Sequence, residues 1–225
     1  MSSVVTFDAG MTLVELDLDF LARRIAERGV VREPAALRAA APQAWRRYDD
    51  RVDAGGAHGR LWHDLLREII GDPDAGLVDW LWEQQPTANL FRAPITGMVE
   101  LARTLRARGV RTAVLSNSEG GLASLLDEIG IADAFEVIVD SGRIGIEKPD
   151  PAIFAYTLAQ LGGARDAPAI HIGDSWSADV AGALASGWRA IWYGRRAVAV
   201  ADPRVACAHD AIEAAAALAD LGLVA

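Results

Sequence analysis

The sequence has few of the residues that several classes of protein require. Cys207 is the only cysteine among 225 residues, so no disulfide can form within the chain, and we expect a reducing compartment, the cytoplasm. No apolar run reaches the roughly 18 residues of a membrane span, and no basic, apolar leader precedes the first strand. Basic residues are outnumbered by acidic ones, and the formal net charge is -9. Nucleic acids and anionic membranes require a basic surface, so neither is expected as a partner.

Lysine is as scarce as cysteine. Of the 22 basic residues only Lys148 is a lysine, and all the others are arginines. An ammonium is a compact point charge, whereas a guanidinium is a broad planar fork, so the two do not fit the same sites. The single lysine therefore indicates a position where a compact cation is needed.

The first candidate for a functional residue follows the first strand. Residues 4–7 form a short β-branched and aromatic run, typical of a buried strand in a parallel sheet, and this run ends at Asp8. Ligands of open α/β sheets bind outside the carboxyl ends of the strands. Asp8 is therefore a candidate nucleophile, metal ligand or both, and the alternative is an ordinary turn residue.

Residues 14–90 are predicted to be helical throughout, with no candidate strand. Apolar residues recur there at helical spacing, as in Leu18, Leu21 and Ile25, and glycines or prolines separate the successive helices. We expect an all-helical block.

From about residue 94 strands and helices alternate. Apolar runs at 112–115, 137–139, 169–172 and 190–193 predict strands, and a last helix is expected at about 210–221. Such alternation is typical of a parallel sheet covered by helices on both faces. The predicted fold is α/β, with a Rossmann-like core of residues 1–13 and 91–225 and an inserted all-helical block of residues 14–90.

Polar residues stand where the predicted strands end. Asp8, Ser116 with Asn117, and Asp174 all follow parallel strands, and Lys148 lies in a loop before a helix. Two carboxylates, a hydroxyl and an ammonium suit a phosphoryl group and Mg²⁺, which prefers carboxylate and phosphate oxygens. Asp179 could orient Lys148 or a metal-bound water, or could be a favourable helix N-terminal carboxylate.

These motifs resemble those of the haloacid dehalogenase (HAD) superfamily of hydrolases. Four of them occur in the same order and spacing: Asp8-Ala9-Gly10-Met11-Thr12-Leu13, Leu115-Ser116-Asn117, Lys148-Pro149-Asp150-Pro151, and Gly173-Asp174-Ser175 with Asp179. The resemblance covers essentially the whole chain, because one HAD subgroup has a helical cap inserted after the first motif.

The resemblance implies a role for each residue. Asp8 would be the nucleophile, forming an aspartyl-phosphate in phosphatase members, with Lys148 and Ser116 as further catalytic residues. Asn117 and Thr12 would bind substrate together with Ser116. Mg²⁺ would be held by Asp8, the Gly10 carbonyl and Asp174, with Asp179 in support.

The chain departs from this pattern at Gly10. In HAD phosphatases the residue two after the nucleophile is a second aspartate, which protonates the leaving alcohol and then activates water. Glycine at position 10 cannot serve as this general acid and base, a group that typically raises the reaction rate by about 10²–10⁴-fold.

Three interpretations remain for Gly10. The chain is a phosphatase with a good leaving group or with an acid from the cap, a carbon–halogen hydrolase, or a low-activity protein that binds a phosphorylated ligand. Dehalogenase members do not need the metal-binding acid kept here as Asp174, so they rank second. The main prediction is a Mg²⁺-dependent phosphatase of a small phosphorylated metabolite, as a monomer or homodimer.

Overall fold

The chain divides into two compact units. The computed structural model describes residues 3–53, 58–71, 75–162, 168–194 and 200–223. The core unit comprises Met1–Glu15 and Phe91–Ala225, and the helical unit comprises Leu16–Leu90. The helical unit is thus inserted into the core unit after the first strand.

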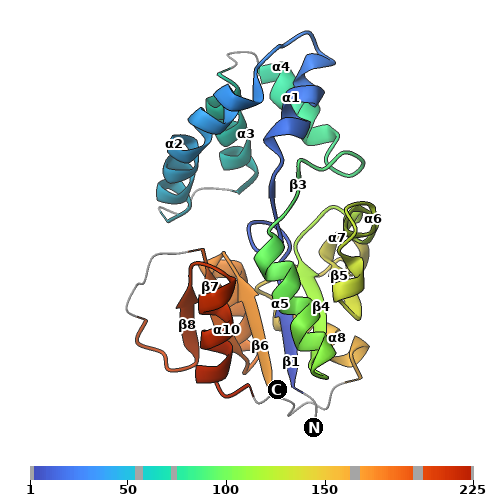
Figure 1. The fold of residues 1–225 in the computed structure, drawn as a ribbon, viewed down its shortest axis with the longest axis vertical. Coiled ribbons are helices and arrows are strands. Elements are labelled where there is room, and N and C mark those ends of the chain that lie inside the picture. The colour runs from blue at the N-terminus through green and yellow to red at the C-terminus, as the bar shows by residue number, and fades with distance from the viewer. Residues whose placement is uncertain (1–2, 54–57, 72–74, 163–167, 195–199, 224–225) are drawn as a thin grey trace. The chain divides into compact units, whose positions relative to one another are not determined.

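A six-stranded sheet forms the centre of the core unit, in the order β5-β4-β1-β6-β7-β8 (Figure 1). Its strands are β1 (Val4–Phe7), β4 (Arg111–Ser116), β5 (Val137–Asp140), β6 (Ala169–Gly173), β7 (Arg189–Tyr193) and β8 (Val205–Ala208). Every neighbouring pair is parallel. The predicted α/β fold with a parallel sheet is therefore confirmed.

Helices cover both faces of this sheet (Figure 1). One face carries α5 (Thr96–Ala107), α6 (Leu122–Glu128) and α10 (Ala211–Asp220), and the other carries α8 (Pro151–Gln160) and α9 (Ala181–Ala185). On the first face, Met98 and Leu126 pack in one cluster with Phe7. On the second, Phe154 and Ala183 pack in one cluster with Val4. Alternate residues of β1 thus enter opposite layers, so the strand is apolar on both sides.

The register of the sheet brings the polar strand ends to one edge. Phe7 at the end of β1 pairs with Val114 of β4 and with Ile172 of β6. Asp8 therefore emerges between the ends of these two strands. At or just after the ends of β1, β4, β5 and β6 on this edge stand Asp8, Ser116, Asp140 and Asp174.

The helical unit contains α1 (Leu18–Ala26), α2 (Pro34–Asp53), α3 (His58–Ile70) and α4 (Ala75–Glu83). Asp17 caps α1, because its carboxylate accepts a hydrogen bond of 2.8 Å from the N–H of Phe20. The apolar residues repeat at helical spacing and are buried, including Leu21, Ile25, Leu37, Leu61, Leu65, Leu66, Ile69 and Leu81. None of the described helices of the chain is long and apolar enough to cross a membrane.

Three short strands were not expected from the sequence. β2 (Val14–Leu16) pairs with β3 (Phe91–Pro94) in a two-stranded sheet, and β8 lies at one end of the large sheet. The prediction that residues 14–90 contain no strand is therefore wrong at Val14–Leu16. In β2 the two apolar residues are buried and Glu15 is exposed, but three residues are too few to distinguish this alternation from a helix.

Candidate active site

Asp8 lies at the centre of the polar edge. Its N–H donates to the carbonyl of Ile172 over 2.8 Å, which extends the parallel pairing of β1 by one residue. Its side chain is buried, and only 8% of the residue is exposed. A carboxylate at this place requires a partner, because burial of an unpaired charge is costly.

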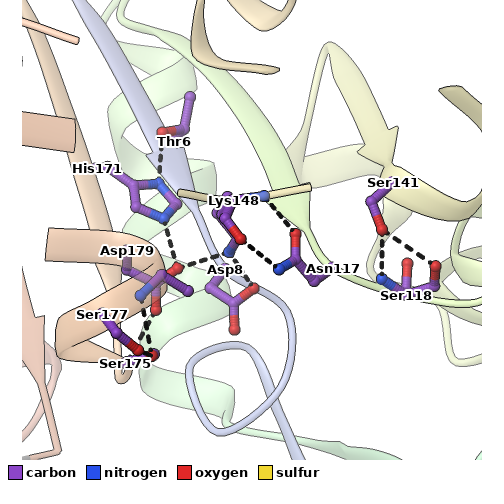
Figure 2. A network of polar contacts seen from close by, with 11 residues as sticks. Thr6, Asp8, Asn117, Ser118, Ser141, Lys148, His171, Ser175, Ser177 and Asp179 are labelled. Atoms are coloured by element: carbon purple, nitrogen blue, oxygen red, sulfur yellow. Dashed lines mark hydrogen bonds and ion pairs between the residues drawn. The ribbon is translucent and has the colours of Figure 1, made fainter. Parts of the chain in front are cut away.

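That partner is Lys148. Its Nζ lies 2.7 Å from Oδ1 of Asp8 and 2.6 Å from Oδ1 of Asp179 (Figure 2). The loop is held in place by Asn117, whose amide oxygen accepts from the N–H of Lys148 and whose amide nitrogen donates to its carbonyl. The single lysine of the sequence is therefore the cation that pairs with these two carboxylates.

Asp179 is held on three sides. Its Oδ1 accepts from Lys148 and lies 3.1 Å from Nε2 of His171, and its Oδ2 accepts from the N–H of Ser175 over 2.8 Å. Nδ1 of His171 lies 2.8 Å from the hydroxyl of Thr6. A carboxylate can only accept, so Nε2 carries the proton and Nδ1 accepts from Thr6. Figure 2 shows this line of side chains running to Asp8.

Burial and ion pairing act in opposite directions on these groups. Burial opposes the charge of Lys148, but Asp179 and Asp8 outweigh it and raise the pKa of the lysine. Burial likewise opposes the charge of Asp179, but Lys148 and His171 outweigh it and hold the pKa of this carboxyl well below its usual range. Burial, followed by the nearby Lys148 charge, lowers the pKa of His171, which is therefore neutral.

Asp8 differs from Asp179. Burial is the largest influence on it and, together with repulsion from Asp179, raises the pKa of Asp8 in spite of the attraction of Lys148. The two carboxyls that share the ammonium therefore differ. Asp179 keeps its charge firmly, whereas burial works against the charge of Asp8.

Asp174 completes an acidic cluster. Carboxylate oxygens of Asp8, Asp174 and Asp179 all lie within 4.8 Å of one another. The main chain of Asp174 is fixed by Trp192, whose indole N–H donates to its carbonyl over 2.9 Å. Oxygen donors this close fit a hard divalent cation such as Mg²⁺. Asp179 already accepts three hydrogen bonds, so Asp8 and Asp174 are the carboxylates better placed to hold one.

The remaining predicted residues lie around this group. Ser116 is the last residue of β4 and is buried, and Gly10 and Thr12 lie in the loop after Asp8. Within the described residues, the Thr12 hydroxyl is buried and has no hydrogen-bond partner. Also within these residues, no hydrogen bond joins the side chain of Ser116 or Thr12 to Asp8 or Lys148. The structure thus links Asp8, Lys148, Asn117 and Asp179 directly.

Three residues of this region were not singled out from the sequence. Thr6 and His171 are fully buried behind Asp179, and Asp140 binds the loop that follows β4. The signal for His171 was present, since a lone ionisable side chain inside the apolar run 169–172 must have a partner in the core. Asp140 stood at a strand end, but nothing in the sequence named the backbone groups that it accepts from.

The fold and the site together define a Rossmann-like α/β protein with an acidic cluster and one ammonium at the carboxyl edge of its sheet. The chain belongs to the haloacid dehalogenase-like hydrolases, because the model of that family matches residues 3–187. The resemblance inferred from the four motifs is thereby confirmed.

Relatives and solved structures agree with this placement. The chain is 32% identical over 203 residues to the haloacid dehalogenase-like hydrolase domain-containing protein 3 of Bos taurus, covering 82% of this chain and 78% of that one. It is 29% identical over 194 residues to the glyceraldehyde 3-phosphate phosphatase of Methanopyrus kandleri, covering 83% and 82%. The crystal structure of a 2-haloacid dehalogenase from Pseudomonas syringae shares the fold, with a TM-score of 0.61, 24% identity and coverage of 97% and 99%.

Proposed function

We propose that this hydrolase is a Mg²⁺-dependent phosphatase that acts on a small phosphorylated metabolite through Asp8. The observation that carries the proposal is the placement of Lys148, whose ammonium bridges Asp8 and Asp179 beside a third carboxylate, Asp174. A cation next to a carboxylate nucleophile and a further set of oxygen ligands suits a dianionic phosphoryl group. The likeness to the phosphatase from Methanopyrus kandleri supports phosphoryl transfer as the reaction, without indicating the leaving group.

Asp8 is the proposed nucleophile. Lys148 holds one of its carboxylate oxygens, and Figure 2 shows the other oxygen turned away from the lysine. Attack of this oxygen on phosphorus forms an aspartyl-phosphate and releases the substrate oxygen with its bonding electron pair. Water then attacks the phosphorus, releases inorganic phosphate and restores the Asp8 carboxylate.

The groups around Asp8 would bind and orient the phosphoryl oxygens. Mg²⁺, when held by Asp8, Asp174 and the Gly10 carbonyl, would supply positive charge against the charge that develops on the transferred group. Lys148 would stabilise the same charge from the side of Asp179. Ser116, Asn117 and the buried hydroxyl of Thr12 are the proposed substrate-binding groups, and Asp179 keeps Lys148 in place.

The helical unit is the proposed cap. It is inserted directly after the loop that follows Asp8, in the position of the cap in the resembling HAD subgroup. A cap of this kind would select the substrate and exclude water during the reaction.

Carbon–halogen hydrolysis is the second candidate, and Gly10 favours it. A halide leaves without a proton, so an enzyme acting on it through Asp8 needs no acid at position 10. The acidic cluster favours the phosphatase, because displacement of a halide by Asp8 does not require a cation held by Asp174.

Phosphate release from a panel of small phosphoesters, with Mg²⁺ and with a chelator, tests the proposal. We expect Mg²⁺-dependent release by the native protein and its loss in Asp8→Asn, which keeps the shape of the side chain. Asp133→Asn, which changes an exposed carboxylate of the same unit, is the matched control and should behave as the native protein. Halide release from 2-haloacids that persists in chelator would instead support the second candidate.

A further inference from the structure

Resting on the proposed function, we infer that the site hydrolyses phosphate compounds whose leaving group departs as a weakly basic anion. This class comprises acyl, enol and aryl phosphates, and it excludes ordinary alkyl phosphates. The inference comes from two observations: Gly10 has no side chain, and the ionisable side chains that contact Asp8 or share its acidic cluster are each engaged elsewhere.

The loop after Asp8 brings no acid to the site. Leu13 N–H donates to the carbonyl of Ala9 over 2.9 Å, and Met11 N–H donates to that of Val14 over 2.7 Å, so the loop has a defined conformation. Gly10 stands within this loop and has no side chain. Among the described residues, no heavy atom lies within 4 Å of the position that a Cβ would take there. The loop thus has room for the Cβ of a side chain at position 10 but carries no acid there.

Lys148 and Asp179 are committed to one another. The ammonium of Lys148 donates to both Asp8 and Asp179, and only 5% of the lysine is exposed. Asp179 is 1% exposed and accepts from Lys148, His171 and the N–H of Ser175. Neither side chain can turn toward a leaving group without breaking the buried ion pair.

His171 is also out of reach. Its two ring nitrogens are bonded to Thr6 and Asp179, and the residue is 0% exposed. Asp174 is the remaining carboxylate of the cluster, and a carboxylate that binds a cation carries no proton. Of the ionisable side chains nearest to Asp8, Lys148 and Asp179 form the buried ion pair, His171 fixes Asp179 in place, and Asp174 remains for the metal.

The chemistry of the leaving oxygen then decides the substrate. A carboxylic acid has a pKa of about 4 and a phenol one of about 10, so both leave readily as anions. A proton on water is lost only at about 15.7, and an alcohol resembles water in this respect. Without a proton donor an alkoxide is a poor leaving group, and the lack of a general acid lowers the rate by about 10²–10⁴-fold.

Measurement of kcat/KM for leaving groups of different basicity tests the inference. The series would comprise acetyl phosphate, substituted aryl phosphates and glycerol phosphate, all with Mg²⁺. We expect log(kcat/KM) to fall as the leaving-group pKa rises, and the alkyl ester to be slower than the aryl esters by about 10²–10⁴-fold. Gly10→Asp should reduce the difference in kcat/KM between alkyl and aryl esters. Gly10→Asn, which has the same shape but no acidic proton, should leave that difference as it is.

The outcomes separate this inference from the proposed function. Equal rates for alkyl and aryl esters, dependent on Asp8, would overturn the inference, would indicate an acid supplied elsewhere in the chain and would leave the phosphatase proposal intact. A folded Gly10→Asp protein with an unchanged difference between these esters would contradict the assignment to position 10. No release from any compound of the series, acetyl phosphate included, would count against the phosphatase proposal itself.

Discussion

His171 donates from Nε2 to Oδ1 of Asp179 over 3.1 Å, and the histidine is fully buried. The same Asp179 oxygen accepts from Lys148, which in turn binds Asp8. A side chain with no access to solvent is thereby connected, through two others, to the proposed nucleophile. We interpret His171 as a positioning residue, because it fixes the carboxylate that holds the ammonium in place.

Replacement of His171 tests this role. His171→Ala should lower kcat for a phosphoester by about 10- to 100-fold with little change in KM, because Lys148 is less well placed while substrate contacts remain. It should also lower the free energy of unfolding by about 1–3 kcal/mol. Thr6→Val removes only the outer hydrogen bond and is the milder control. A His171→Ala protein with native kcat would contradict the positioning role.

The Lys148–Asp179 ion pair should show strong coupling. Lys148→Met leaves Asp179 buried without its cation and should reduce the free energy of unfolding by about 3–5 kcal/mol. Adding Asp179→Asn should recover part of this loss, because one of the two carboxylates left without the ammonium is then gone. Urea unfolding of the two single variants and the double variant measures the coupling, and strictly additive effects would show that the pair is not linked as the 2.6 Å contact indicates.

The stability of the protein should decrease in acid through Asp179. Its pKa is lowered in the folded protein from the ordinary value of 3.8, so the unfolded chain takes up a proton first as the pH falls. The stabilisation is complete above that ordinary value and is lost progressively below it. Urea unfolding between pH 6 and pH 3 should show the native protein losing its advantage over Asp179→Asn. A difference that stays constant across this range would refute the assignment.

Two glycines of the site offer a matched pair of substitutions. A Cβ at Gly173 would overlap the carboxyl group of Asp179, whereas one at Gly10 would meet no heavy atom within 4 Å among the described residues. Gly173→Ala should therefore destabilise by about 1–3 kcal/mol and reduce activity. Gly10→Ala should change stability by no more than about 0.5 kcal/mol. Thermal unfolding of both variants checks this, and equal shifts would be the contrary result.

Asp140 holds together the loop that follows β4. Its carboxylate accepts from the N–H groups of Gly120, Leu122 and Gly142, each over 3.0 Å. Asp140→Ala leaves these donors without their partner and should reduce the free energy of unfolding by at least about 1–3 kcal/mol. Asp127→Ala, an exposed carboxylate of α6, is the control. Similar unfolding midpoints for both variants would show that the loop does not depend on Asp140.

The sequence predicted those strands and helices whose apolar residues recur with a clear period over a sufficient length. The runs that became β1, β4, β5, β6 and β7 were evident because each is apolar and bounded by glycine or polar residues. β8 contains Ala206, Cys207 and Ala208, whose small side chains carry no strong strand preference, so it was missed. The helical segment after β6 begins with a π-helical turn at Trp176–Val180, which continues into α9 and which no apolar period in the sequence marks.

The site was partly predictable for a similar reason. Asp8, Asp174 and Lys148 stand out because strand ends and scarcity mark them in the sequence. The connections between them do not stand out, since Lys148 and Asp8 are 140 residues apart and meet only through the register of the sheet. Thr6 and His171 lie on neighbouring strands at paired positions, and this pairing too is fixed by the register and not by any local pattern.

The two short strands that join the units have a consequence for the evolution of this protein. β2 pairs with β3, and just beyond them the N–H of Asp17 donates to the carbonyl of Leu90 over 2.9 Å. The inserted segment therefore starts and finishes at a single stem. A recombination event or a designed graft could exchange residues 16–90 as a cassette, while every strand of the large sheet keeps its neighbours. Under the proposed role of the helical unit as a cap, such an exchange would change the substrate selectivity and leave the catalytic residues of the core unit in place.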